Sequence, residues 1–117
     1  MLPKKKRLTT GLFDQVFKVG KVLHGHNFWI RSFSLLESLP SRYAVAIPKK
    51  IAKTAVLRNR IKRIVYTAIE TLDKGGVFSN QTNHMTIFGV KTDVSKISYE
   101  EVVKEVKDLL EKRAKMR

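Results

Sequence analysis

The sequence predicts an α+β sandwich, in which helices pack on one mixed sheet. Along the 117 residues, some segments have apolar residues at helical spacing, and others have apolar and polar residues in the alternating pattern of a strand. Apolar residues make up 43% of the chain, which is enough for one core. We expect a single domain over residues 1–117, with residues 1–8 as a basic lead-in, and the order helix, two or three strands, helix, strand, helix.

The first half of the chain predicts a short helix followed by strands. Thr9 or Thr10 can cap a helix that ends before Gly20. Residues 21–23 predict a small strand, and residues 26–36, rich in Phe, Trp and Ile, predict a longer one. Because side chains alternate across a strand, one face of the longer strand carries Phe28 and Ile30 and the other carries Trp29, Arg31 and Phe33.

Residues 42–47 form the clearest strand, because bulky side chains alternate with small ones. We expect the bulky face, with Tyr43 and Val45, to lie on the core. The small face, with Ala44 and Ala46, leaves room for another molecule to approach the sheet closely.

The second half predicts a long helix, a strand and a last helix. Thr54 can cap a helix over residues 54–73, and residues 85–91 predict a strand weakened by Gly89. A capping box at Ser98 begins the last helix. Five of the ten Asp and Glu lie in that last segment among lysines, which is typical of a solvated structural helix.

The formal net charge is +14, and the first half carries nearly all of it. Residues 1–63 hold 15 of the 24 Lys and Arg but only 2 of the 10 Asp and Glu. Such a surface favours a polyanion, so nucleic acid is the expected partner and an anionic membrane surface is the main alternative.

We expect no membrane span and no signal peptide. The absence of Cys fits a reducing, cytoplasmic setting.

The predicted long helix carries its cations against its own macrodipole. Its first turns have no carboxylate, although that end favours negative charge by ~0.3–1 kcal/mol per group. Bound phosphate would reverse the effect, whereas the alternative is a basic face in a generally basic protein. The candidate RNA-binding residues are Lys49, Lys50, Lys53, Arg58, Asn59, Arg60, Lys62, Arg63 and Tyr66.

A helical projection divides these residues between two flanks and an outward face. Asn59 and Tyr66 are predicted to lie on the outward face, between the flanking cations. Asn59 can bind a 2′-hydroxyl, a base edge or a water of a metal ion, and spacing alone does not choose among them.

Aromatic side chains predict a second nucleic-acid-binding surface. Phe13 and Phe17 lie one helical turn apart and can stack on unpaired bases, while core packing is the alternative for each of them. Combined with the small strand face, they predict a groove for an extended strand, lined by Phe13, Phe17, Trp29, Arg31, Phe33, Ala44 and Ala46.

Catalytic side chains are not expected. His24, His26 and His84 show no metal-ligand spacing. Asp14 and Glu37 are the only acids in the basic half, whereas a metal-dependent nuclease needs a cluster of carboxylates.

With these residues in hand, the chain resembles the protein components of bacterial ribonuclease P. The run from Arg58 to Arg63 (RNRIKR) matches the signature of that family, and Tyr99 to Glu101 resembles the start of its last helix. The resemblance implies the order αβββαβα, of the ribosomal-protein-S5-domain-2-like type. It also implies a left-handed βαβ crossover between the 42–47 and 85–91 strands, although most crossovers are right-handed.

The resemblance further implies a ribonucleoprotein endoribonuclease that removes the 5′ leader from precursor tRNA, with catalysis and Mg²⁺ in the RNA subunit. The protein would bind ribonuclease P RNA through residues 58–63 and the leader through the groove, with no tightly bound cofactor and no obligatory protein partner. The family often has Arg at the position of Tyr66. It often has an aromatic residue at the position of Arg31, so an ionic contact with the leader is expected at Arg31 in place of stacking. A ribosomal-type structural RNA-binding protein and a DNA-binding domain are the alternatives.

Overall fold

The computed structural model describes residues 7–34, 42–74 and 84–115, and its elements follow the predicted order. They are α1 (Thr10–Val19), β1 (Lys21–His24), β2 (Phe28–Ser34), β3 (Arg42–Ala46), α2 (Ala55–Lys74), β4 (His84–Val90), the 3-10 helix η2 (Val94–Lys96) and α3 (Tyr99–Lys115).

Two differences from the prediction are small. β2 begins at Phe28, two residues later than expected, and the short helix η2 was not predicted. The lead-in residues 1–6 and the end of the strand predicted over 26–36, residues 35 and 36, lie outside the described residues.

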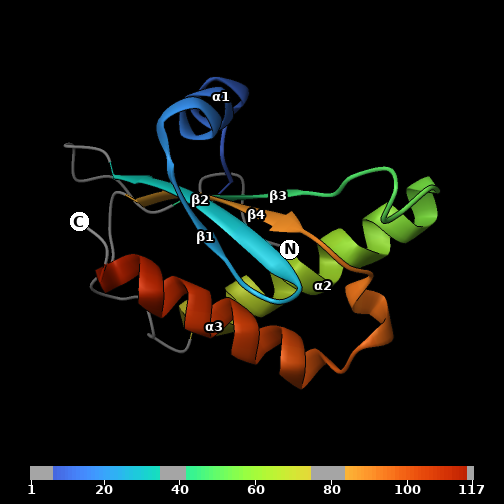
Figure 1. Cartoon of the computed structure of the whole chain (residues 1–117). Helices are drawn as coiled ribbons and strands as arrows, with labels where there is room; N and C mark the ends of the chain where they lie inside the picture. Colours follow the sequence, from blue (N-terminus) through green and yellow to red (C-terminus); the bar gives the residue numbers. More distant parts are fainter. Residues whose placement is uncertain (1–6, 35–41, 75–83, 116–117) are drawn as a thin grey trace.

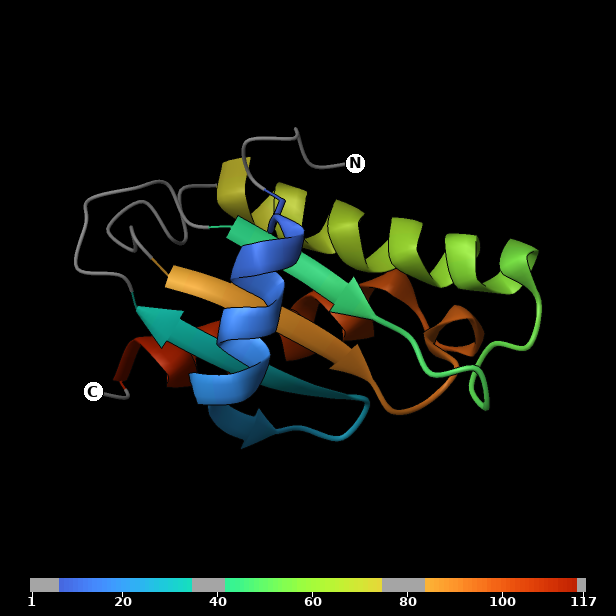
Figure 2. The same cartoon turned by 90° about the horizontal axis from the view of Figure 1, so that it is seen from above.

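The four strands form one mixed sheet in the order β1-β2-β4-β3. β2 pairs antiparallel with β1 and with β4, whereas β3 pairs parallel with β4. In the view of Figure 2, β3 and β4 run in the same direction and α2, which joins them, returns behind the sheet. This crossover is left-handed, against the general rule, and confirms the handedness that the resemblance implies.

The helices cover both faces of the sheet (Figure 1). α2 and α3 pack on one face, where Phe28, Ile30, Tyr43 and Val45 join the main core. The alternation predicted for β2 and β3 is therefore confirmed. α1 crosses the opposite face, where a smaller cluster forms around Val16.

Gly89 is a packing requirement of this sheet. In the register of β2 and β4, Trp29 lies directly opposite Gly89. A Cβ atom at residue 89 would lie 1.8 Å from Cε2 of Trp29, because the indole ring occupies the space that a side chain would need. The glycine that weakens β4 as a predicted strand thus allows Trp29 to lie flat on the sheet.

Glu105 of α3 holds the turn between β1 and β2. Its Oε2 accepts hydrogen bonds from the backbone N–H groups of Asn27 and Phe28, at 2.8 and 2.9 Å. Its Oε1 accepts from Nδ2 of Asn27 at 2.9 Å. The Asn27 amide is oriented in turn by Thr92, whose hydroxyl donates to Asn27 Oδ1 at 2.6 Å. One acid of the supposedly solvated helix α3 is therefore a structural link.

The end of the lead-in joins the sheet. Arg7 forms a parallel bridge with Tyr43, and the N–H of Leu8 donates to the Tyr43 carbonyl at 3.0 Å. Nη1 of Arg42 donates to the Arg7 carbonyl at 3.3 Å. Residues 7 and 8 therefore belong to the folded domain.

Candidate nucleic-acid interface

The start of α2 is a turn followed by a capped helix. The N–H groups of Ile51 and Ala52 both donate to the Pro48 carbonyl, at 3.0 and 3.2 Å. Oγ1 of Thr54 then accepts from the N–H of Leu57 at 3.1 Å, which confirms Thr54 as the N-cap. The turn and the cap place the lysines that precede the helix, Lys49, Lys50 and Lys53, close to the first residues of α2.

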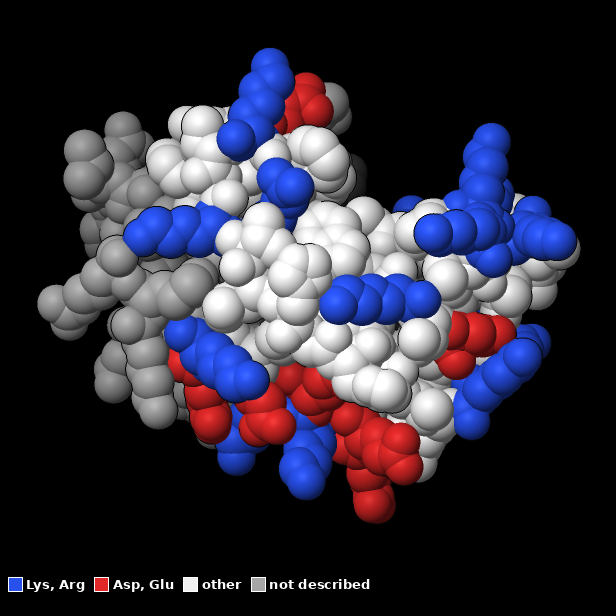
Figure 3. All heavy atoms as spheres, in the orientation of Figure 1, with Lys and Arg blue, Asp and Glu red and all other residues white. Residues whose placement is uncertain are grey.

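Cationic side chains surround this helix start, and most of them reach solvent. The exposed members of this group, called the α2 patch below, are Lys49, Lys50, Lys53, Arg60 and Arg63, with the amide of Asn59 among them. Within the residues that the structure describes, no ion pair joins any of these cations to a carboxylate. Figure 3 shows Lys and Arg gathered at the end of the molecule where α2 begins.

Asp93 is an acid whose charge interacts with this patch, but it is already engaged. Oδ1 of Asp93 accepts hydrogen bonds from the hydroxyl and from the N–H of Ser95, the second at 3.0 Å. The Ser95 hydroxyl is the main cause that lowers the pKa of Asp93, and the charges of Lys96 and Arg60 lower it further. The carboxylate caps η2 and leaves the Arg60 guanidinium open.

Arg58 and Lys62 form the other flank of α2 and are half-buried. Nη1 of Arg58 donates to the Ala52 carbonyl at 3.3 Å. Arg58 therefore fixes the turn that carries Lys49 to Lys53, and part of its hydrogen-bonding capacity is used inside the protein.

The prediction that Tyr66 lies on the outward face is wrong. Its side chain is only 8% exposed and belongs to the main core. Burial raises the pKa of Tyr66, and this effect is larger than the opposing effects of a backbone hydrogen bond with Val45 and of the Arg7 charge. Tyr66 is buried because α2 is covered by the sheet and by α3, so that the outward face of the helix is narrower than the helical projection predicts.

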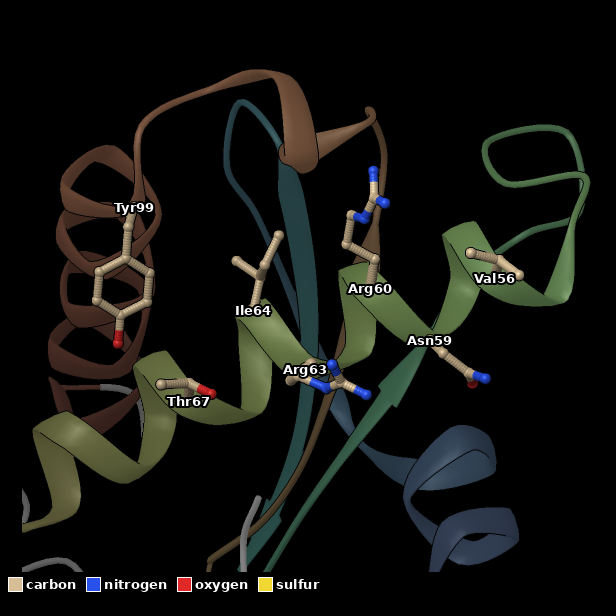
Figure 4. A pocket seen from close by; sticks show the side chains of 7 residues that line it. All are labelled: Val56, Asn59, Arg60, Arg63, Ile64, Thr67 and Tyr99. Atoms are coloured by element: carbon tan, nitrogen blue, oxygen red, sulfur yellow. The ribbon is translucent and has the colours of Figure 1, made fainter.

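A hollow that the sequence did not predict lies between α2 and the start of α3. It has a volume of about 470 Å³, and Figure 4 shows its lining side chains, which include Val56, Ile64, Thr67 and Tyr99 beside Arg60 and Arg63. No signal in the sequence joins residue 99 to this helix, because their proximity depends on how α3 packs. We call it the α2–α3 hollow.

The residues predicted to line an aromatic groove lie on the opposite face of the sheet. The rings of Phe13 and Phe17 stack, with centroids 6.4 Å apart. The Arg31 guanidinium carbon lies 4.5 Å from the centroid of the Phe17 ring and 5.8 Å from that of Trp29. Nη1 of Arg31 also donates to the Phe17 carbonyl, in the last turn of α1. Arg31 is therefore held between two aromatic rings.

The small strand face is less open than predicted. Ala44 is buried with Val16, Met85 and Ile87, so α1 is the element that approaches the sheet there. The structure thus contradicts Ala44 as an open groove residue.

Phe33 and Ala46 are half-buried at the edge of the same cluster. The open part of the groove is a hollow of about 330 Å³ lined by Phe17, Trp29 and Arg31 with Val22 and His24. The last two were not predicted, because β1 gives no functional signal of its own.

The described residues hold no group of three His, Cys, Asp or Glu that could bind a metal ion. His24 and His26 are exposed, and the side chain of His84 is outside the described ones. No helix in the described part of the chain has both the length and the apolar character needed to cross a membrane.

Comparison with known sequences gives a consistent result. The family model for ribonuclease P matches residues 2–114. A ribonuclease P protein component of Microcystis aeruginosa is 31% identical over 105 residues, which cover 86% of this chain and 82% of the relative. The corresponding protein of Rippkaea orientalis is 29% identical over 114 residues, covering 93% and 87%.

Solved structures share the fold. The Staphylococcus aureus RNase P protein superposes with a TM-score of 0.76 at 21% identity, covering 96% of this chain and 97% of that one. The Thermotoga maritima RNase P protein also gives 0.76 at 21% identity, covering 91% and 96%. At this identity the structures show a common architecture, while the sequence matches show descent. This chain belongs to the ribonuclease P protein family.

Proposed function

We propose that the two surfaces divide the work of a ribonuclease P protein: the α2 patch binds the catalytic RNA, and the aromatic groove binds the 5′ leader of precursor tRNA. RNA binding and precursor-tRNA processing are the general function of this family, and the chain is the protein component of an endoribonuclease. A ribonuclease P RNA is the partner that membership implies. We place catalysis and its Mg²⁺ in that RNA, and the complex in the cytoplasm.

The observation that carries the proposal is the uncompensated charge of the α2 patch. Arg60 and Arg63 are exposed and form no ion pair with a carboxylate of the described residues, although their helix start repels cations. Phosphate groups would bind the guanidinium groups and would also interact favourably with the positive end of the helix dipole. Arg58 supports the patch from inside, by holding the preceding turn.

The aromatic groove supports leader binding, with a mixed chemistry. The exposed Phe17 ring and the half-buried Trp29 ring can each offer a face to an unpaired base. Arg31 stands between the two rings and brings a positive charge to the centre of the groove. We propose that Arg31 contacts a leader phosphate there, and that Phe17 and Trp29 contact the neighbouring bases.

The direct test is reconstitution with a ribonuclease P RNA and cleavage of a precursor tRNA at low Mg²⁺. We expect the protein to increase cleavage, and we expect Arg60→Ala to require more protein for the same gain. RNA binding without any gain in cleavage would instead favour a structural RNA-binding protein. No binding at all would overturn the proposal.

The leader contact is tested separately with Phe17→Ala and Arg31→Ala. Val19→Ala on the same helix is the matched control, because Val19 is exposed but outside the groove. We expect both groove variants to weaken binding of leader-bearing substrate more than binding of mature tRNA. An equal loss for both substrates would remove the groove from the leader path.

A further inference from the structure

The α2–α3 hollow has an apolar lining that the fold leaves exposed. Val56 in the first turn of α2 is 71% exposed, and Tyr99 at the first position of α3 is 41% exposed. Both belong to the small group of large apolar side chains that reach solvent, and they line the same hollow. The hollow's volume of about 470 Å³ lies within the range of ~300–1,000 Å³ typical of small-ligand sites.

The rim of the hollow is cationic. Figure 4 shows Arg60 and Ile64 on one row of α2, Arg63 and Thr67 on the next, and the Tyr99 ring facing them from α3. An apolar floor between guanidinium groups fits a ligand that is both flat and anionic. A phosphate alone would not use the floor, and an uncharged apolar ligand would not use the rim.

The Tyr99 ring is held in place before any ligand arrives. Its hydroxyl is hydrogen-bonded with Oγ1 of Thr71, one turn beyond the hollow, at 3.1 Å. The backbone at Tyr99 is fixed by Ser98, whose Oγ accepts from the N–H of Glu101 at 3.2 Å. A platform fixed in this way loses little conformational entropy when a base stacks on it.

We infer that the α2–α3 hollow binds one unpaired nucleotide of the RNA subunit, with its base against Tyr99 and Ile64 and its phosphate at the guanidinium groups of Arg60 and Arg63. The inference rests on the proposed function of the α2 patch. It adds the requirement that the RNA presents an unpaired base, which phosphate binding by the α2 patch does not need. Paired RNA presents phosphates and 2′-hydroxyls but keeps its bases stacked, so only an extruded base can occupy the apolar floor.

A crosslinking experiment tests the position of the nucleotide. The chain has no Cys, so Thr67→Cys, at an exposed position beside Tyr99, gives one site for a photoactivatable aryl azide in the reconstituted holoenzyme. Val19→Cys is the matched control, because Val19 is 57% exposed but lies on α1, across the sheet. We expect the residue 67 probe to mark one unpaired nucleotide that the residue 19 probe does not mark. Crosslinks confined to paired RNA would overturn the inference.

A second experiment tests stacking. Tyr99→Leu keeps an apolar side chain but removes the aromatic face, whereas Tyr99→Phe keeps the face and removes only the hydrogen bond to Thr71. We expect Tyr99→Leu to weaken binding of ribonuclease P RNA by about 5- to 100-fold and Tyr99→Phe by less than about threefold. The salt dependence of binding should stay unchanged in both, because every cation that binds phosphate is still present.

The outcomes separate this inference from the proposed function. If Tyr99→Leu binds the RNA like the unaltered protein while Arg60→Ala still reduces the salt dependence, the inference falls and the proposed function stands. If Arg60→Ala also leaves the salt dependence unchanged, both fall. Thermal unfolding of the two Tyr99 variants reports whether α3 remains docked.

Discussion

Replacing Glu105 should loosen the whole edge of the sheet at which β1 turns into β2. In Glu105→Ala, the N–H groups of Asn27 and Phe28 and the side-chain amide of Asn27 lose their acceptor. Each hydrogen bond to a charged group contributes ~1.5–3 kcal/mol, and partial exposure of the site to water reduces this loss. We expect the unfolding free energy to fall by about 2–4 kcal/mol in total. For a chain of this length that corresponds to a decrease in Tm of roughly 8–16 °C.

Glu105→Gln should cause a smaller loss of stability than Glu105→Ala. The glutamine oxygen can still accept from two N–H groups, but its amide nitrogen then faces the Asn27 amide nitrogen, and both are donors. Rotation of the Asn27 amide by half a turn would relieve this only by reversing the hydrogen bond with Thr92, whose hydroxyl would then have to accept from Nδ2 of Asn27. We expect a loss of about 1–2 kcal/mol, between the unaltered protein and Glu105→Ala.

The assay is thermal and urea unfolding, with Asp108→Ala as the control. Asp108 lies three residues further along α3, carries the same charge and is exposed. If Glu105→Ala changes Tm no more than Asp108→Ala does, the carboxylate does not hold the turn and the reasoning is wrong. Hydrogen exchange at the Asn27 and Phe28 amides gives a local measure of the same effect.

Three further variants test other parts of the structure, and a fourth tests pH dependence. Gly89→Ala should lose about 1–3 kcal/mol in urea unfolding, because the new methyl group meets the Trp29 ring, and Trp29→Leu in the same chain should restore part of the loss. Arg60→Ala should lower the slope of log K against log salt for RNA binding by about 0.7–0.9 for each phosphate that the protein no longer binds. Arg58→Ala should lower the slope and also the Tm, because it frees a backbone carbonyl. Burial raises the pKa of Tyr66 above its ordinary value of 10.0, so above about pH 10 the unfolded chain ionises first and stability falls as pH rises; Tyr66→Phe should reduce that fall in Tm.

Local patterns were sufficient for the elements and for the faces of the strands. The alternation around Trp29 and Tyr43 placed each side chain on its observed face, since a strand has only two faces. The caps at Thr54 and Ser98 were also predicted correctly, because capping depends on residues a few positions apart. The charge of the α2 patch could be predicted for the same reason: its members are close in sequence.

Features that depend on how elements meet could not be predicted in this way. Tyr66 was placed outside because a helix projection does not show how many neighbours cover the helix. The partnership of Gly89 with Trp29 depends on strand register, and that of Glu105 with Asn27 on the docking of α3. The role of Tyr99 in the α2–α3 hollow could not be predicted either, because the hollow is formed by two helices that are far apart in sequence.

The unequal distribution of charge gives this molecule a direction. One end carries the cations of the α2 patch, whereas α3 mixes lysines with five of the ten acids (Figure 3). In the field of an RNA, such a molecule experiences a torque as well as an attraction, and it turns its α2 end toward the polyanion before they touch. A larger share of collisions would then be productive at low ionic strength, and the part of α3 beyond its first turn would face away from the RNA.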